Sequence, residues 1–142
     1  MKRFAFILAA LALTVCASAQ VKITKNEHPL QKVEGLTQVS SLMLRDSTYY
    51  LMFTTDNRYD EPIFISLGEG KAAALESLAT LDDMMEGVAK GETFYLADIN
   101  DEQFFVSRIP LTKYASLTST SRAGHATLHR VAIKRAIKAL EQ

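Results

Sequence analysis

Two histidines in the C-terminal part of the chain have the spacing that zinc-binding helices use. His125 and His129 stand four residues apart, and on a helix that spacing brings both rings to one face. In the helical zinc motif of metalloproteases a glutamate follows the first histidine, whereas this chain has Ala126 there. We therefore keep His125 and His129 as metal candidates, with two surface histidines on a basic helix as the alternative.

Two other segments resemble ligand-binding loops but lack the residues on which those loops depend. Gly68-Glu69-Gly70-Lys71 has the place of a phosphate-binding loop, but such a loop needs glycine where Ile65 stands and a hydroxyl where Ala72 stands. Asp98-Ile99-Asn100-Asp101-Glu102 alternates oxygen ligands like a calcium loop, without the loop's glycine and its terminal glutamate. We interpret the first segment as a glycine turn and the second as a hairpin turn.

The glycine turn joins a predicted strand to the most regular helix in the sequence. Pro62 to Leu67 is apolar, β-branched and aromatic, which predicts a strand. From Lys71 to Glu86 apolar residues recur at steps of three and four, which predicts a helix over 71–86. We expect this helix to end at Gly87 with an apolar cap contact from Val88.

The remaining segments favour an α+β fold. Residues 39–44 and 49–55 predict one hairpin, and 93–99 with 103–109 predict another. The Ser- and Thr-rich stretch 114–121 is expected to be a surface loop. Apolar residues recur again over 126–140, which predicts a second helix with a basic polar face. We therefore expect a mostly antiparallel sheet of about five strands with two main helices (71–86 and 126–140), and no internal repeat.

The first nineteen residues are organised like a signal peptide. Lys2 and Arg3 precede an apolar run that ends at Val15, and Ala17-Ser18-Ala19 is a small-residue cleavage site. We expect cleavage after Ala19, a single mature domain over 20–142, and a periplasmic or extracellular location. A lipid anchor on Cys16 is the alternative, although Val15 replaces the small residue that precedes a lipidated cysteine.

Cysteine content and charge narrow the possible functions. Cys16 is the only cysteine, so the mature chain is expected to lack disulfides and thiolate metal ligands. Removal of Lys2 and Arg3 from the 16 basic residues leaves 14 against 16 acidic ones, which argues against general nucleic-acid binding. The charges are segregated, since 56–102 holds twelve acids and three bases and 108–142 holds seven bases and one acid. No motif calls for a cofactor.

Side-chain alternation along the strands divides the predicted sheet into two faces. The face assigned to the core, against helix 71–86, contains Leu42, Leu44, Leu51, Phe53, Ile63, Ile65, Leu67, Phe94, Leu96, Phe104 and Val106. The opposite face contains Met43, Tyr50, Met52, Phe64, Tyr95 and Phe105, which are of residue types enriched in protein interfaces. Either the chain covers this second face itself, with 20–35 or the C-terminal helix, or the face binds another protein or a second copy.

The leading functional hypothesis is a small exported binding protein without catalytic activity, such as an inhibitor, an immunity-type protein or an accessory subunit. It rests on the predicted signal peptide, the single α+β domain and the lack of a catalytic motif. One alternative is an exported hydrolase or metal-dependent enzyme that uses the His125 and His129 helix face. The other is a homo-oligomeric structural component. The expected partner is another protein or a second copy, with no nucleic acid and no transmembrane segment.

Overall fold

The computed structural model describes residues 29–142, and within that range one order of elements occurs twice. The first sheet contains β1 (Gln31–Gly35), β2 (Ser40–Arg45), β3 (Thr48–Phe53) and β4 (Ile63–Glu69), and helix α2 (Gly70–Ala89) follows it. The second sheet contains β5 (Phe94–Ala97), β6 (Gln103–Arg108), β7 (Tyr114–Thr118) and β8 (Ala126–His129), and helix α3 (Arg130–Leu140) follows it. The predicted signal peptide, its cleavage site and Cys16 lie outside the described residues.

Both sheets are antiparallel meanders in which each strand pairs with the next one along the chain. The predicted α+β class is confirmed, while the strand number differs, since there are two sheets of four strands rather than about five strands in one. The expected surface loop over 114–121 is wrong because β7 lies there, with Ala115 and Leu117 buried and their strand neighbours exposed or partly exposed. The two halves share their architecture although the sequence shows no repeat.

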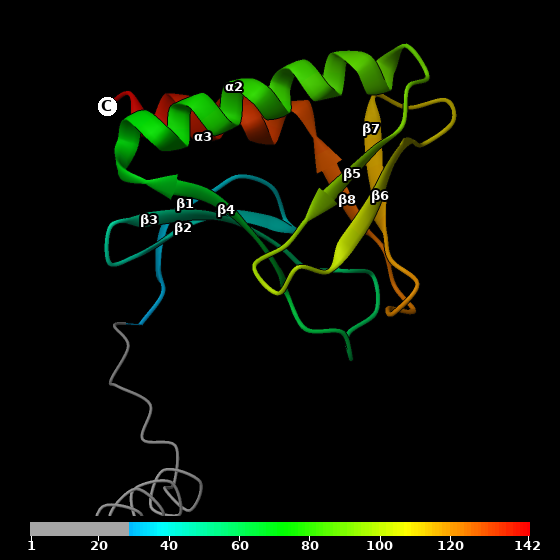
Figure 1. Cartoon of the computed structure of the whole chain (residues 1–142), viewed down its shortest axis with the longest axis horizontal. Helices are drawn as coiled ribbons and strands as arrows, with labels where there is room; N and C mark the ends of the chain where they lie inside the picture. The colour runs from blue at the N-terminus through cyan, green and yellow to red at the C-terminus, as the bar shows by residue number, and fades with distance from the viewer. Residues whose placement is uncertain (1–28) are drawn as a thin grey trace, which may run out of the picture.

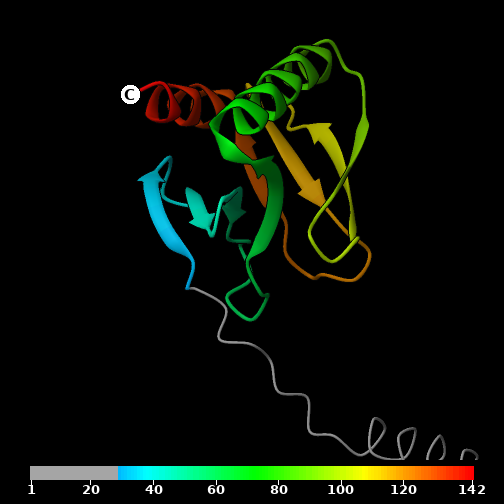
Figure 2. The ribbon, with the colours of Figure 1, turned by 60° about the vertical axis from the view of Figure 1, so that its left-hand side comes forward.

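The helices lie side by side and cover the inner faces of both sheets (Figure 1). Helix α2 contacts β3 and β4 of the first sheet and β6 of the second, and α3 contacts β1 and β8. In Figure 2 the first sheet lies at the left and the second sheet at the right, and both lie beneath the two helices. Because each helix packs on both sheets, the buried apolar side chains form one core.

The residues that alternation assigned to the core occupy it in the structure. Each of them is buried or packs directly against the buried cluster. The largest fully buried side chains include Phe53 from β3 and Phe104 from β6. Full burial of a side chain of this size stabilises the fold by about 1.5–3 kcal/mol, so both sheets contribute to the same core.

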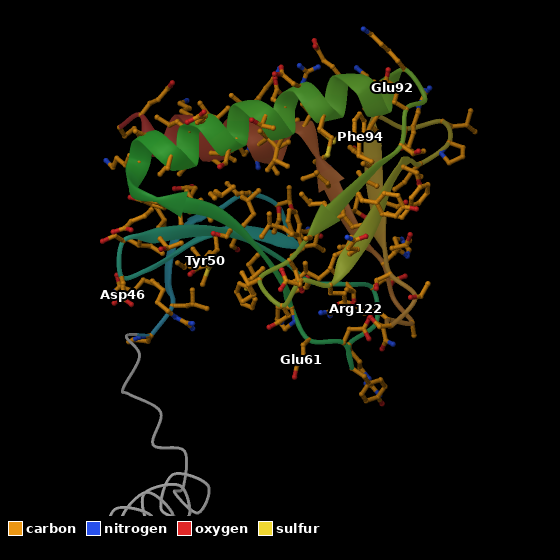
Figure 3. All side chains as sticks on the ribbon, in the orientation of Figure 1. Asp46, Tyr50, Glu61, Glu92, Phe94 and Arg122 are labelled. Atoms are coloured by element: carbon orange, nitrogen blue, oxygen red, sulfur yellow. The ribbon has the colours of Figure 1, made fainter. Side chains whose placement is uncertain are left out.

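Helix α2 ends at Ala89, and the predicted stop at Gly87 is wrong. The N–H of Glu92 donates to the carbonyl of Gly87 at 3.0 Å, and the N–H of Gly91 donates to the carbonyl of Val88 at 3.0 Å. These two bonds form a Schellman motif, and Gly91 adopts its left-handed position with φ +93°. Gly87 has a different role, because a Cβ there would lie 2.8 Å from Cζ of Phe94, which Figure 3 shows beneath this end of α2.

Helix α3 begins at Arg130, so the predicted helix over 126–140 is wrong in its first four residues. Ala126 and Leu128 are buried while Thr127 and His129 are partly exposed, which is the period of a strand. These four residues form β8 and pair with β7. A short apolar run next to a helix does not by itself distinguish strand from helix.

The loop after β3 and the equivalent loop after β7 meet at the end of the molecule opposite the helices. The N–H of Asp56 donates to the carbonyl of His125 at 3.1 Å, and the N–H of Gly124 donates to Oδ2 of Asp60 at 3.0 Å. A Cβ on Gly124 would lie 2.6 Å from Oδ1 of Asp56. The junction between the halves therefore requires glycine at 124.

Candidate binding surface

The predicted second face is distributed over the outer sides of two sheets, so the expectation of a single sheet face is wrong. Met43, Tyr50, Met52 and Phe64 lie on the first sheet, and Tyr95 and Phe105 lie on the second. Alternation gave the outward direction of each side chain from its own strand. It carries no information about which strands share a sheet, because pairing joins segments that are distant in sequence.

On the first sheet the four residues form two neighbouring cross-strand pairs. Met43 pairs with Tyr50 across β2 and β3, and Met52 pairs with Phe64 across β3 and β4. All four side chains are half-buried. Figure 3 shows Tyr50 on the side of this sheet that faces away from α2. The pairs form a compact apolar area on the outside of the sheet, because facing residues of paired strands are close neighbours.

On the second sheet both outward aromatic residues, Tyr95 and Phe105, are exposed. They face each other across β5 and β6, and their rings meet edge to face with centroids 5.6 Å apart. The exposed fraction is 72% for Tyr95 and 36% for Phe105. Their strand neighbours point inward into the core, which fixes the backbone of both strands. The second sheet therefore presents an aromatic pair outward from two paired strands.

The outer areas of the two sheets approach each other where β4 passes the turn after β5. The N–H of Ile99 donates to the carbonyl of Phe64 at 3.0 Å. The side chain of Ile99 is itself 48% exposed, so a large apolar residue stands at the boundary between the sheets. We name the surface formed by Phe64, Tyr95, Ile99 and Phe105 the aromatic ridge.

The two candidate metal ligands do not lie on one helix face. His125 precedes β8 and His129 ends it. Nδ1 of His125 lies 3.1 Å from Oδ2 of Asp56, while the ring of His129 stacks on Tyr114 with centroids 3.8 Å apart. Burial lowers the pKa of His129. Among residues 29–142 no group of three histidines, cysteines or carboxylates could hold a metal ion, and the helix on which the metal-enzyme alternative depended begins only at Arg130.

The two motifs that resemble ligand-binding loops have structural roles in the described chain. Oδ1 of Asp98 accepts bonds from the N–H groups of Asn100 at 2.8 Å and of Glu102 at 3.0 Å, which closes the β5–β6 turn. The segment Gly68-Glu69-Gly70 ends β4 and starts α2. The interpretation of 98–102 as a hairpin turn is therefore confirmed. No separate glycine turn is present, because β4 runs through Glu69 directly into α2, and the positive φ angles of Gly68 and Gly70 redirect the chain there.

A charged cluster that the sequence did not reveal links the β7–β8 loop to the rest of the second sheet. Glu102 accepts hydrogen bonds from Ser119, Ser121 and Arg122, the last at 3.0 Å. Arg122 also donates to the carbonyl of Glu61, beside which Figure 3 shows it. Burial by itself raises the pKa of Glu102, but the hydrogen bonds from the two serines and Arg122 outweigh it and lower that pKa. The partners are about twenty residues apart in sequence, so no local spacing indicates them.

A second ion-pair cluster joins the two helices. Arg130 donates to both oxygens of Asp82 at 2.7 and 3.0 Å and lies 3.4 Å from Glu86. The hydrogen bond from Arg130 is the main cause that lowers the pKa of Asp82. The acidic half and the basic half of the sequence therefore meet at the α2–α3 contact. In both clusters the carboxylates serve to hold segments together, which leaves the apolar outer surface as the candidate for recognition.

The chain has no match among protein-family models, curated proteins or solved structures. Neither α2 nor α3 combines the length and the apolar character that a membrane crossing requires.

Proposed function

We propose that the protein is a small non-catalytic binding protein and that the aromatic ridge is where another protein, or a second copy of this chain, docks. The observation that carries the proposal is the Tyr95–Phe105 pair, which is exposed on regular strands rather than on a loop. Exposed apolar clusters of this kind mark interaction sites.

The ridge is suited to protein recognition because Tyr95 and Phe105 project from paired strands whose inward-facing residues pack in the core. A tyrosine or phenylalanine has only two side-chain torsions to fix on binding, so it supplies contact area at little entropic cost. Tyrosine also provides a hydroxyl that can bond at the edge of an interface. Aromatic residues of this type are enriched at the centres of protein interfaces.

The proposal includes export. The segment Ala17-Ser18-Ala19 after an apolar run supports processing after Ala19. The intact mass of the native protein is expected to correspond to residues 20–142. A mass that retains residues 1–19 would exclude this processing, and a lipid attached to Cys16 would replace the soluble form with an anchored one.

A photo-crosslinker at the ridge tests the docking site. The analogue p-benzoylphenylalanine in place of Phe105 keeps an aromatic ring at a position that is 36% exposed. Irradiation in the producing cells is expected to join this position to a discrete protein or to a second copy. The matched control is the same analogue in place of Tyr59, which is 80% exposed on the β3–β4 loop. Equal crosslinking at both positions, or none at position 105, would contradict the proposal.

A further inference from the structure

A cleft of about 830 Å³ opens between α2, α3 and the β6–β7 loop. Figure 1 shows this loop at the same end of the molecule as the C-terminal end of α2. The volume lies in the range of small-molecule sites, about 300–1,000 Å³. Tyr95 and Phe105 do not line the cleft, so what it binds is independent of the proposed function.

The polar part of the cleft is cationic. Four of its ten lining residues are basic, and none of the ten, all within the described range, is acidic: Arg108, Lys113, Arg130 and Lys134 are the basic ones. Arg130 is neutralised by Asp82 and Glu86 of α2. Arg108 is held by the carbonyls of Ala89 and Thr112, at 3.5 and 3.4 Å, which are neutral.

The two lysines have no ion-pair partner of their own among the described residues, although the Asp82 carboxylate attracts Lys134 as well as Arg130. Lys113 and Lys134 are exposed, and neither forms an ion pair with a carboxylate of residues 29–142. The first turn of α3, which also lines the cleft, carries no acidic residue and no side-chain cap. Its positive end therefore adds to the lysine charge, and the combination favours an anion.

The apolar part of the cleft includes a residue with a strained backbone conformation. Leu111 is fully exposed and has a φ of +63°, a conformation that favours glycine. It follows Pro110 in a turn closed by the N–H of Thr112 and the carbonyl of Ile109 at 3.2 Å, where type II geometry normally selects glycine. Val131 is 53% exposed and Tyr114 41% exposed on the same cleft. Strained residues that persist in a fold tend to occur at functional positions.

We propose that this cleft binds a small organic anion with an apolar chain. The anionic group lies between Lys113 and Lys134, and the chain lies on Leu111, Val131 and Tyr114. A carboxylate and a phosphate monoester share this chemistry. A cationic amphiphile of the same length has the wrong charge for the two lysines. A small inorganic anion has the right charge but no chain to contact the apolar residues.

Calorimetric titration of the mature protein with octanoate, below its micelle concentration, tests the class of ligand. Saturable heat is expected with octanoate or with octyl phosphate, and the stronger of the two identifies the anionic group. Acetate, inorganic phosphate and octylammonium are expected to give no saturable heat. Equal binding of octylammonium, or no binding of either octyl anion, would overturn the proposal.

Variants locate the binding. Lys113→Glu combined with Lys134→Glu is expected to weaken octyl-anion binding at least tenfold, while Lys71→Glu at the far end of α2 leaves it unchanged. Leu111→Gly removes the apolar contact and the backbone strain together. It is therefore expected to weaken binding without lowering the thermal midpoint. Unchanged affinity in both the lysine variant and Leu111→Gly would overturn the assignment of the site.

Discussion

Glu102 shows how single charged residues act in this protein. Three side chains of the β7–β8 loop donate to its carboxylate, and only 19% of its side chain is exposed. The carboxylate form is thereby favoured in the folded state, and Arg122 carries the contact on to the β3–β4 loop. One ionised group thus fixes the position of a loop that would otherwise have little buried apolar surface.

The lowered pKa of Glu102 makes stability depend on pH in a defined direction. In the unfolded chain this carboxyl titrates near its ordinary value of 4.5, and in the folded chain it titrates lower. Its contribution is therefore complete above pH 4.5 and is lost as the pH falls through the folded-state pKa. Glu102→Gln is expected to lose less stability than the wild type on acidification.

Urea unfolding at a series of pH values measures this difference. The matched control is Asp101→Asn, an exposed neighbour on the same turn, which is expected to follow the wild-type pH dependence. If Glu102→Gln lost stability on acidification as steeply as the wild type, protonation of Glu102 would not contribute to the pH dependence of folding.

Helix α3 illustrates what decides stability at the scale of an element. It meets α2 through the Arg130 ion pairs and meets the core through Ala132, Ile133, Ala136 and Leu140. Partly exposed ion pairs contribute little, typically under about 1 kcal/mol each. The buried apolar stripe therefore dominates the attachment of the helix.

Two β-branched residues of α3 give a matched test. Ile133 is fully buried and Val131 is 53% exposed. Ile133→Ala leaves a cavity and is expected to lower the free energy of unfolding by about 2–5 kcal/mol. Val131→Ala is expected to change it by less than about 0.5 kcal/mol. Denaturant unfolding measures both free energies. Similar losses of stability for the two variants would contradict the orientation of α3 in which Ile133 faces the core and Val131 faces solvent.

The sequence predicts elements well where their pattern is local and strong. Helix α2, the hairpin formed by β2 and β3, and the inward and outward directions of the strand residues follow from periodicity alone. The sequence does not predict β7 because its buried positions are only Ala115 and Leu117 and the surrounding Ser and Thr residues are typical of a loop. The pattern predicts helix where β8 lies because the apolar residues of β8 run directly into those of α3.

At the scale of the whole molecule the arrangement repeats, and the repeat was invisible in the sequence. Four strands and a helix occur twice, the helices meet at one end, and the Asp56 and His125 loops meet at the other. Outward positions such as Tyr95 were predictable, because alternation is local. The division into two sheets, the Glu102 cluster and the cationic cleft were not, because each depends on segments far apart in the chain.

The aromatic ridge lies on the outside of both sheets, and its role as a docking site is the central claim. The direct test is a capture experiment. Tagged mature protein is incubated with the fraction outside the cytoplasm and with an untagged copy, and what it retains on beads is identified. The wild type and Tyr59→Lys are expected to retain the same discrete protein or the untagged copy. Tyr95→Lys is expected to retain neither while its thermal midpoint stays nearly unchanged, because that side chain is 72% exposed. Equal capture by all three proteins would contradict the claim, and so would unfolding of Tyr95→Lys, since it would place the residue inside the fold.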